Sequence, residues 1–190
     1  MDNLTNSIDQ VVEENALPHE WSKEVLAELK DLGVTNNKRD DLRKIPFVTI
    51  DGKDAKDFDD AVFCEANKDG FVLQVAIADV AEIVEPSSSI DKEALSRGTS
   101  IYFPKRVIPM LPEEISNNLC SLIPNEDRNV LVCKMNFTLE GEVNSYDFSE
   151  SVINSHKRFT YNEVEFLKQN IDTNLSADIL NSIKALEKLT

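Results

Sequence analysis

Runs of apolar and β-branched residues predict a set of strands along the chain. They cover residues 47–50, 61–65, 71–80, 130–139 and 143–153. The second and third runs are joined by Asn67-Lys68-Asp69-Gly70, and the last two by Glu140-Gly141-Glu142, both of which favour tight turns. Two antiparallel hairpins follow from this spacing.

Apolar residues at helical spacing predict helices between and after these strands. We expect a helix that opens at Pro18, carries Val25, Leu26 and Leu29 on one face and is capped near Gly33. Trp21 in this helix is read as a packing residue. The other helical segments are one turn near residues 8–12, a helix capped by Ser89 or Asp91 that ends at Gly98, and residues 113–122, 161–169 and 177–189.

Two segments are harder to assign. One shows neither helical nor strand periodicity, and the other has an apolar face with no evident packing partner. Residues 99–112 hold three prolines and read as an extended, ordered loop. The last helix places Ile179, Leu180, Ile183, Leu186 and Leu189 on one face, which we expect to remain exposed near the end of the chain. Taken together, the pattern predicts an α+β fold with a mostly antiparallel sheet and flanking helices.

Size and composition describe a soluble globular chain. The 190 residues form one domain or part of a larger one, and 41% of them are hydrophobic. No run approaches the roughly 20 apolar residues that span a bilayer, and the acidic N-terminus lacks a signal peptide pattern. We therefore expect a cytoplasmic protein with no membrane partner. The pattern points to no particular oligomeric state.

Cysteine and histidine are too few and too scattered for a zinc site. Cys64, Cys120 and Cys133 are odd in number and widely spaced, and the two histidines lie far apart. We expect reduced and mostly buried thiols, as in cytoplasmic proteins.

The net charge of −15 argues against free-standing nucleic-acid binding, because phosphate contacts need a basic surface. Removing four aspartates of the stretch described next still leaves −11, so that stretch alone does not explain the acidity. Either the chain does not bind nucleic acid or basic partner segments lie elsewhere.

The most unusual stretch is DGKDAKDFDD, residues 51–60, in which five of ten residues are aspartates. Apolar segments flank it on both sides, and crowded carboxylates repel one another unless cations neutralise them. Magnesium prefers such oxygen ligands, and four carboxylates suffice for two ions that activate a water and stabilise a leaving oxygen. A solvated acidic loop is the alternative. An EF-hand is excluded, because position 5 from either Asp51 or Asp57 is an alanine.

The spacing suggests how four of these side chains meet. In an extended segment Asp57 and Asp59 point to one side and Asp60 to the other. A bulge at residues 59–60 would turn Asp60 back, and a bend at Gly52 would bring Asp51 close.

Residues 41–62, DLRKIPFVTIDGKDAKDFDDAV, closely resemble the signature of the ribonuclease II/ribonuclease R family, the RNB catalytic domain. Further likeness lies, in the family's order, in VAIADV, RGTSIYFP, VIPMLP, SNNLCSL and SHKRFTY at residues 75–80, 97–104, 107–112, 116–122 and 155–161. The resemblance covers about residues 7–190 and is nearer to the ribonuclease R branch. It implies an RNB-like fold and a processive 3′→5′ hydrolytic exoribonuclease that uses Mg²⁺ to degrade RNA to nucleoside 5′-monophosphates.

The resemblance also assigns residues. Asp51, Asp57, Asp59 and Asp60 match the family's catalytic and metal-binding aspartates, with Asp59 most tied to catalysis, while Asp54 has no assigned role. Tyr102 matches a tyrosine that stacks on a base at the 3′ end of single-stranded RNA; from composition alone it would equally be a loop aromatic tucked into the core. The basic residues next to these motifs contact phosphates or are solvated surface charges: Lys105, Arg106, Lys157 and Arg158.

The family carries cold-shock-type domains before the catalytic domain, an S1 domain after it, and an arginine-containing motif in the second half of the catalytic domain. By this resemblance, residues 1–34 are a connector and helix and residues 35–190 are the N-terminal half of a truncated RNB domain. Two functions stay open: a catalytic segment of the exoribonuclease, or a non-catalytic chain that folds and binds Mg²⁺ or a partner without turnover.

Overall fold

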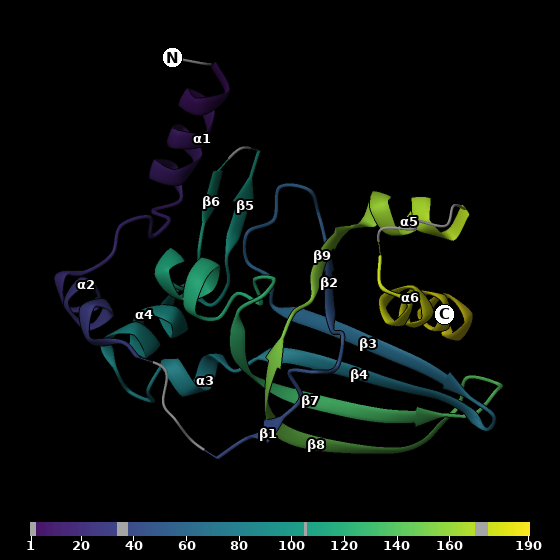
Figure 1. Cartoon of the computed structure of the whole chain (residues 1–190). Helices are drawn as coiled ribbons and strands as arrows, with labels where there is room; N and C mark the ends of the chain where they lie inside the picture. The colour runs from purple at the N-terminus through teal and green to yellow at the C-terminus, as the bar shows by residue number, and fades with distance from the viewer. Residues whose placement is uncertain (1–2, 34–37, 105, 170–174) are drawn as a thin grey trace. The chain divides into compact units, whose positions relative to one another are not determined.

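The computed structural model describes residues 3–33, 38–104, 106–169 and 175–190. They fall into two compact units, Met1–Thr35 with Val80–Ser116 and Asn36–Asp79 with Asn117–Thr190. Figure 1 labels the elements of both units. The domain boundary expected between residues 34 and 35 lies outside the described residues and stays a prediction. Among the described helices, none has the length and apolar content to cross a membrane.

The second unit is built on a seven-stranded sheet in the order β1-β8-β7-β4-β3-β2-β9. Within the described chain its four central pairings are antiparallel, and the pairings at the two edges, β1 with β8 and β2 with β9, are parallel. The strands are β1 (Asp40–Asp41), β2 (Val48–Asp51), β3 (Asp60–Asn67), β4 (Gly70–Ala78), β7 (Asp127–Phe137), β8 (Val143–Asn154) and β9 (Lys157–Thr160). The α+β fold with a mostly antiparallel sheet is therefore confirmed.

Two helices lie against one face of this sheet, α5 (Tyr161–Gln169) and α6 (Ala177–Leu189) (Figure 1). Ile179 and Ile183 of α6 are buried with Val48 and Phe159 of the sheet. Burying each such side chain contributes about 1.5–3 kcal/mol. The expectation of an exposed face on the last helix was wrong, because strands earlier in the chain cover it.

Exposed apolar area lies instead on the sheet. Strand register puts Met135 and Tyr146 in one row with Leu73, which packs against α6. Farther from the helix on this face, Tyr146 and Phe148 are 66% and 68% exposed. Their rings meet edge to face with centroids 5.7 Å apart. Tyr146 and Phe148 therefore form exposed apolar surface on the sheet, which the helical pattern could not indicate.

The turn between β3 and β4 needs a glycine. Gly70 has φ of +146°, and a Cβ there would collide with the backbone of Phe137 and Thr138. The turn expected at residues 67–70 is confirmed.

The first unit contains short helices and one hairpin. Its elements are α1 (Asn3–Glu14), α2 (Lys23–Glu28), η1 (Leu29–Asp31), α3 (Val80–Ile83), α4 (Ser89–Arg97), β5 (Ile101–Phe103) and β6 (Arg106–Ile108), and the π-helix η2 (Glu114–Leu119) begins in it. Ile8 and Val12 of α1 pack on Ile108 of the hairpin. Arg97 holds the unit together from α4: it donates to the carbonyl oxygens of Pro18, Glu20 and Pro109 and lies 3.6 Å from the centroid of Trp21. Trp21 is thus a packing residue, as expected.

Several local predictions need correction. The helix expected from Pro18 begins only after Ser22, whose hydroxyl accepts a hydrogen bond from the amide of Val25. Helix α4 is capped by Ser88 rather than by Ser89 or Asp91, although Gly98 ends it in the left-handed conformation as expected. Residues 99–112 contain the β5–β6 hairpin instead of a loop, because their prolines lie outside the paired residues.

Candidate functional site

The aspartate stretch forms the connection between strands β2 and β3. Asp51 is the last residue of β2 and Asp60 is the first of β3, and these strands are antiparallel neighbours. An antiparallel pair brings the end of one strand beside the start of the next, so the two carboxylates are close although nine positions separate them. Asp51 also accepts a hydrogen bond from the amide of Gly52 through Oδ1, at 2.6 Å. This contact tightens the bend that the sequence placed at Gly52.

The carboxylates of this loop act on one another electrostatically. Desolvation by the surrounding atoms, and then the charges of Asp57, Asp60 and Asp51, raise the pKa of Asp59 above its ordinary value. Desolvation and the charge of Asp51 raise the pKa of Asp60 as well. Both side chains reach solvent, so the desolvation comes from atoms packed beside the carboxyl groups rather than from full burial. The fold therefore brings together the four aspartates predicted from the sequence, while Asp54 is an exposed residue of the same loop.

These four side chains are the ones that could hold divalent cations. Carboxylate oxygens are the donors that Mg²⁺ prefers, and their mutual repulsion is the condition that a cation would relieve. Among the residues that the structure describes, however, no three His, Cys, Asp or Glu side chains are arranged to ligate one ion. The donor chemistry fits Mg²⁺. The carboxylates lie near one another, but they do not form a complete set of ligands around one point.

A buried serine anchors the middle of the loop. Ser121, which is fully buried, accepts a hydrogen bond from the amide of Phe58 at 3.0 Å and donates one to the carbonyl oxygen of Lys56 at 2.9 Å. Its hydroxyl thus bridges the residues on either side of Asp57. The carbonyl oxygen of Phe58 in turn accepts from the amide of Leu122 at 2.8 Å.

The C-terminal end of the loop is fixed by strand β4. The amide of Ala78 donates to the carbonyl oxygen of Asp59 at 2.9 Å. Backbone contacts therefore set the direction of the chain at Asp59 and leave its side chain available.

An arginine holds the other end. Arg158 of β9 donates through Nη2 to the carbonyl oxygens of Gly52 and Lys53, at 2.9 and 2.7 Å. The sequence left Arg158 as a phosphate contact or a solvated charge, and the structure shows that it binds the loop backbone. Its neighbour Lys157 places Nζ 5.4 Å from the centroid of Phe159.

Sequence reasoning gave neither Ser121 nor Arg158 a role in the loop. The only signal was that both lie in segments that resemble the RNB family, SNNLCSL and SHKRFTY. Their distance along the chain from residues 51–60 hides the contact until the sheet is formed.

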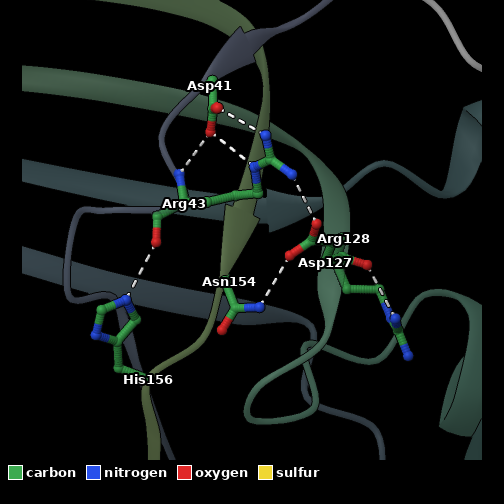
Figure 2. Close-up of polar contacts among 6 residues, drawn as sticks. All are labelled: Asp41, Arg43, Asp127, Arg128, Asn154 and His156. Carbon is green, nitrogen blue, oxygen red and sulfur yellow. Dashed lines mark hydrogen bonds and ion pairs between the residues drawn. The ribbon is translucent and has the colours of Figure 1, made fainter.

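A polar network at the edge of the sheet fixes the segment that leads into β2 (Figure 2). Arg43 donates to both carboxylate oxygens of Asp41, at 2.7 and 2.8 Å, and to Asp127 at 3.0 Å. Asn154 donates to the other oxygen of Asp127, and His156 contacts the carbonyl oxygen of Arg43 at 3.2 Å. Side chains from β1, β7 and β8 are thereby tied to the chain that enters the site-bearing strand.

The predicted base-stacking residue belongs to the first unit. Tyr102 lies on β5, opposite Val107 of β6, and is 68% exposed. It is therefore not an aromatic tucked into the core, and its ring is accessible. Arg106 on the same hairpin is ion-paired with Asp9 at 2.6 Å, and Lys105 lies outside the described residues.

The family model described as the RNB domain matches residues 39–190 of the chain. Ribonuclease R of Acidithiobacillus ferrooxidans is 51% identical over 162 residues, which make up 83% of this chain and 37% of that protein. The solved structure of Mycoplasma genitalium RNase R in complex with double-stranded RNA superposes with a TM-score of 0.93 at 36% identity, over 99% of this chain and 34% of that one. The structure of yeast Ssd1, a pseudonuclease, matches with a TM-score of 0.69 at 17% identity, which shows a shared fold alone.

The chain thus spans about a third of the length of these two ribonuclease R relatives. The family model covers most residues of the chain, including the aspartate loop and the two residues that bind its backbone, Ser121 and Arg158. On these grounds the chain belongs to the RNB domain family.

Proposed function

We propose that this chain is a segment of a processive 3′→5′ hydrolytic exoribonuclease that degrades RNA to nucleoside 5′-monophosphates with Mg²⁺. The gathering of four aspartates on the β2–β3 loop is the observation that carries the proposal, because their charges act on one another at a site that the family model covers. Similarity to ribonuclease R supports the substrate class and the direction.

Asp51, Asp57, Asp59 and Asp60 are the residues that would hold the metal. When bound, Mg²⁺ supplies activation of a water and stabilisation of the leaving oxygen. The carboxylates of this chain provide negative charge and hard oxygen donors, and the anchored loop backbone keeps them from moving apart. Asp59 is the central member, because all three of the other carboxylates raise its pKa.

Tyr102 would bind the 3′-terminal part of single-stranded RNA by stacking on a base. An aromatic ring that is two thirds exposed can stack on any of the four bases, which suits an enzyme that must tolerate every sequence. The ion pair of Arg106 with Asp9 fastens the hairpin that carries this ring to α1.

A second candidate is a chain that folds and binds Mg²⁺ or a partner without turnover. One observation favours it: in the part of the chain that the structure describes, no three carboxylates are placed around one point. A fold shared with a pseudonuclease is consistent with it, since fold alone does not carry activity.

The thiols support a reducing, cytoplasmic location for this chain. Cys64 and Cys120 are buried and Cys133 is half-buried, and none of these three described residues takes part in a disulfide. Thiols persist in the reduced state where cellular reductants keep them so.

The test is incubation of this chain with 3′-labelled oligo(A) and Mg²⁺, with a full-length ribonuclease R as the positive control. Release of labelled mononucleotide, abolished by Asp59→Asn and by chelation, supports the catalytic segment. Asp54→Asn is the matched control, because it removes the same charge from the same loop and should leave release unchanged. No release from this chain, beside activity of the full-length enzyme, supports the second candidate. Equal loss in both variants would contradict the assignment of the aspartates.

A further inference from the structure

Arg158 binds the backbone at the start of the aspartate loop. Its Nη2 donates to the carbonyl oxygens of Gly52 and Lys53 at 2.9 and 2.7 Å, and it lies 3.5 Å from that of Ala55. The first two distances are those of firm hydrogen bonds, whereas the third is at the outer limit. The amide of Ala55 also donates to the carbonyl of Gly52 at 3.2 Å, so the arginine closes over a backbone turn.

The same guanidinium reaches the far side of the loop. Its Cζ lies 4.9 Å from the centroid of Phe58, a ring that is 8% exposed. A guanidinium over a shielded aromatic face gains a cation–π attraction. The Arg158 side chain therefore contacts the loop both before and after Asp57. Arg158 lies on β9, and the register of β9 with β2 places it opposite Thr49.

These contacts leave the carboxylates free for other cations. Because its hydrogen bonds go to backbone carbonyl oxygens, the arginine holds the loop without occupying the carboxylate oxygens. The geometry differs from that of a phosphate-binding arginine, whose donors would point outward to a ligand.

We propose that Arg158 is a positioning residue, which fixes the backbone of residues 52–58 so that the four aspartates stay gathered before any ion binds. This inference rests on the proposed metal-binding function of the loop. Arginine suits the task better than lysine, since its planar group both bonds to several carbonyls and stacks on a ring.

The test compares Arg158→Ala and Arg158→Lys with Lys134→Ala in the 190-residue chain. Lys134→Ala is the matched control, because it also removes one positive charge, from an exposed side chain of β7. Mn²⁺ titration followed by electron paramagnetic resonance measures ion binding, and hydrogen exchange measures the amides of residues 52–58. We expect Arg158→Ala to weaken Mn²⁺ binding at least tenfold and to speed loop exchange at least tenfold. Arg158→Lys should give an intermediate loss, and Lys134→Ala should stay within twofold.

Unchanged exchange and Mn²⁺ affinity in a folded Arg158→Ala chain would overturn the proposal. So would a loss of RNA binding alone, which is the outcome for a phosphate contact. If the unmodified chain binds no Mn²⁺, the proposed metal function fails, and loop exchange alone decides the positioning role. If Arg158→Ala does not fold, Phe58→Leu removes the ring face while keeping apolar bulk. Its loop exchange should then rise severalfold, and no change would count against the proposal.

Discussion

Replacing Ser121 with alanine removes the hydroxyl that bridges the two sides of Asp57. The change is nearly isosteric, so it creates almost no cavity and isolates the hydrogen bonds. The amide of Phe58 loses its acceptor in a buried place, and the carbonyl of Lys56 loses a donor in a partly buried one.

The two losses differ in size. An orphaned buried donor costs about 1–3 kcal/mol, whereas a lost bond whose partner can turn to water costs about 0.5–1.5 kcal/mol. We therefore expect Ser121→Ala to lower the free energy of unfolding by roughly 2–4 kcal/mol. For a chain of this size the midpoint of thermal unfolding should fall by about 4–16 °C.

Urea unfolding followed by circular dichroism measures the difference, and hydrogen exchange locates it. The amide of Phe58 should exchange faster in the variant. Ser145→Ala is the control, because the hydroxyl of Ser145 accepts an exposed hydrogen bond from Asn136. That variant should stay within about 0.5 kcal/mol of the unmodified chain. A Ser121→Ala chain as stable as the control would show that the bridge does not hold the loop.

Three further outcomes follow from contacts elsewhere. Gly70→Ala should destabilise the chain by more than about 3 kcal/mol in urea unfolding, since its Cβ would overlap the backbone at the end of β7 at a positive φ; near-normal stability would contradict the strained turn. Hydrogen bonds from Arg43 lower the pKa of Asp41, so this carboxylate stabilises the fold fully above its unfolded pKa of about 4 and progressively less as the pH falls below that value. The stability of an Arg43→Ala chain should accordingly change less between pH 7 and pH 3 than that of the unmodified chain, and equal slopes would contradict the role of the pair. Burial, and then the charge of Glu65, raise the pKa of the Cys64 thiol to about 11, so a disulfide reagent at pH 8 should modify Cys64 only after unfolding; fast reaction of the folded chain would contradict this.

Most of the elements in the second unit follow from local sequence signals. Apolar runs bounded by turn residues placed β3, β4, β7 and β8, and helical spacing placed α5 and α6, because these signals are local. The sequence also singled out the aspartates, since five carboxylates between two strands are conspicuous without any knowledge of their neighbours.

The surroundings of the aspartates, by contrast, depend on how distant segments of the chain pack. The helical pattern of residues 177–189 shows an apolar face but not its partner. The sheet residues that cover this face come from β2, more than 100 residues earlier, and from the nearer strand β9. Ser121 and Arg158 likewise carry no local mark of their contacts with residues 52–58. Arg158 reaches the loop because β9 pairs with β2. Ser121 reaches it because residues 121–122 lie against Phe58, whose carbonyl oxygen accepts from the amide of Leu122. Side-chain chemistry can be read along the chain, whereas the partner of a hydrogen bond is fixed only when distant segments pack together.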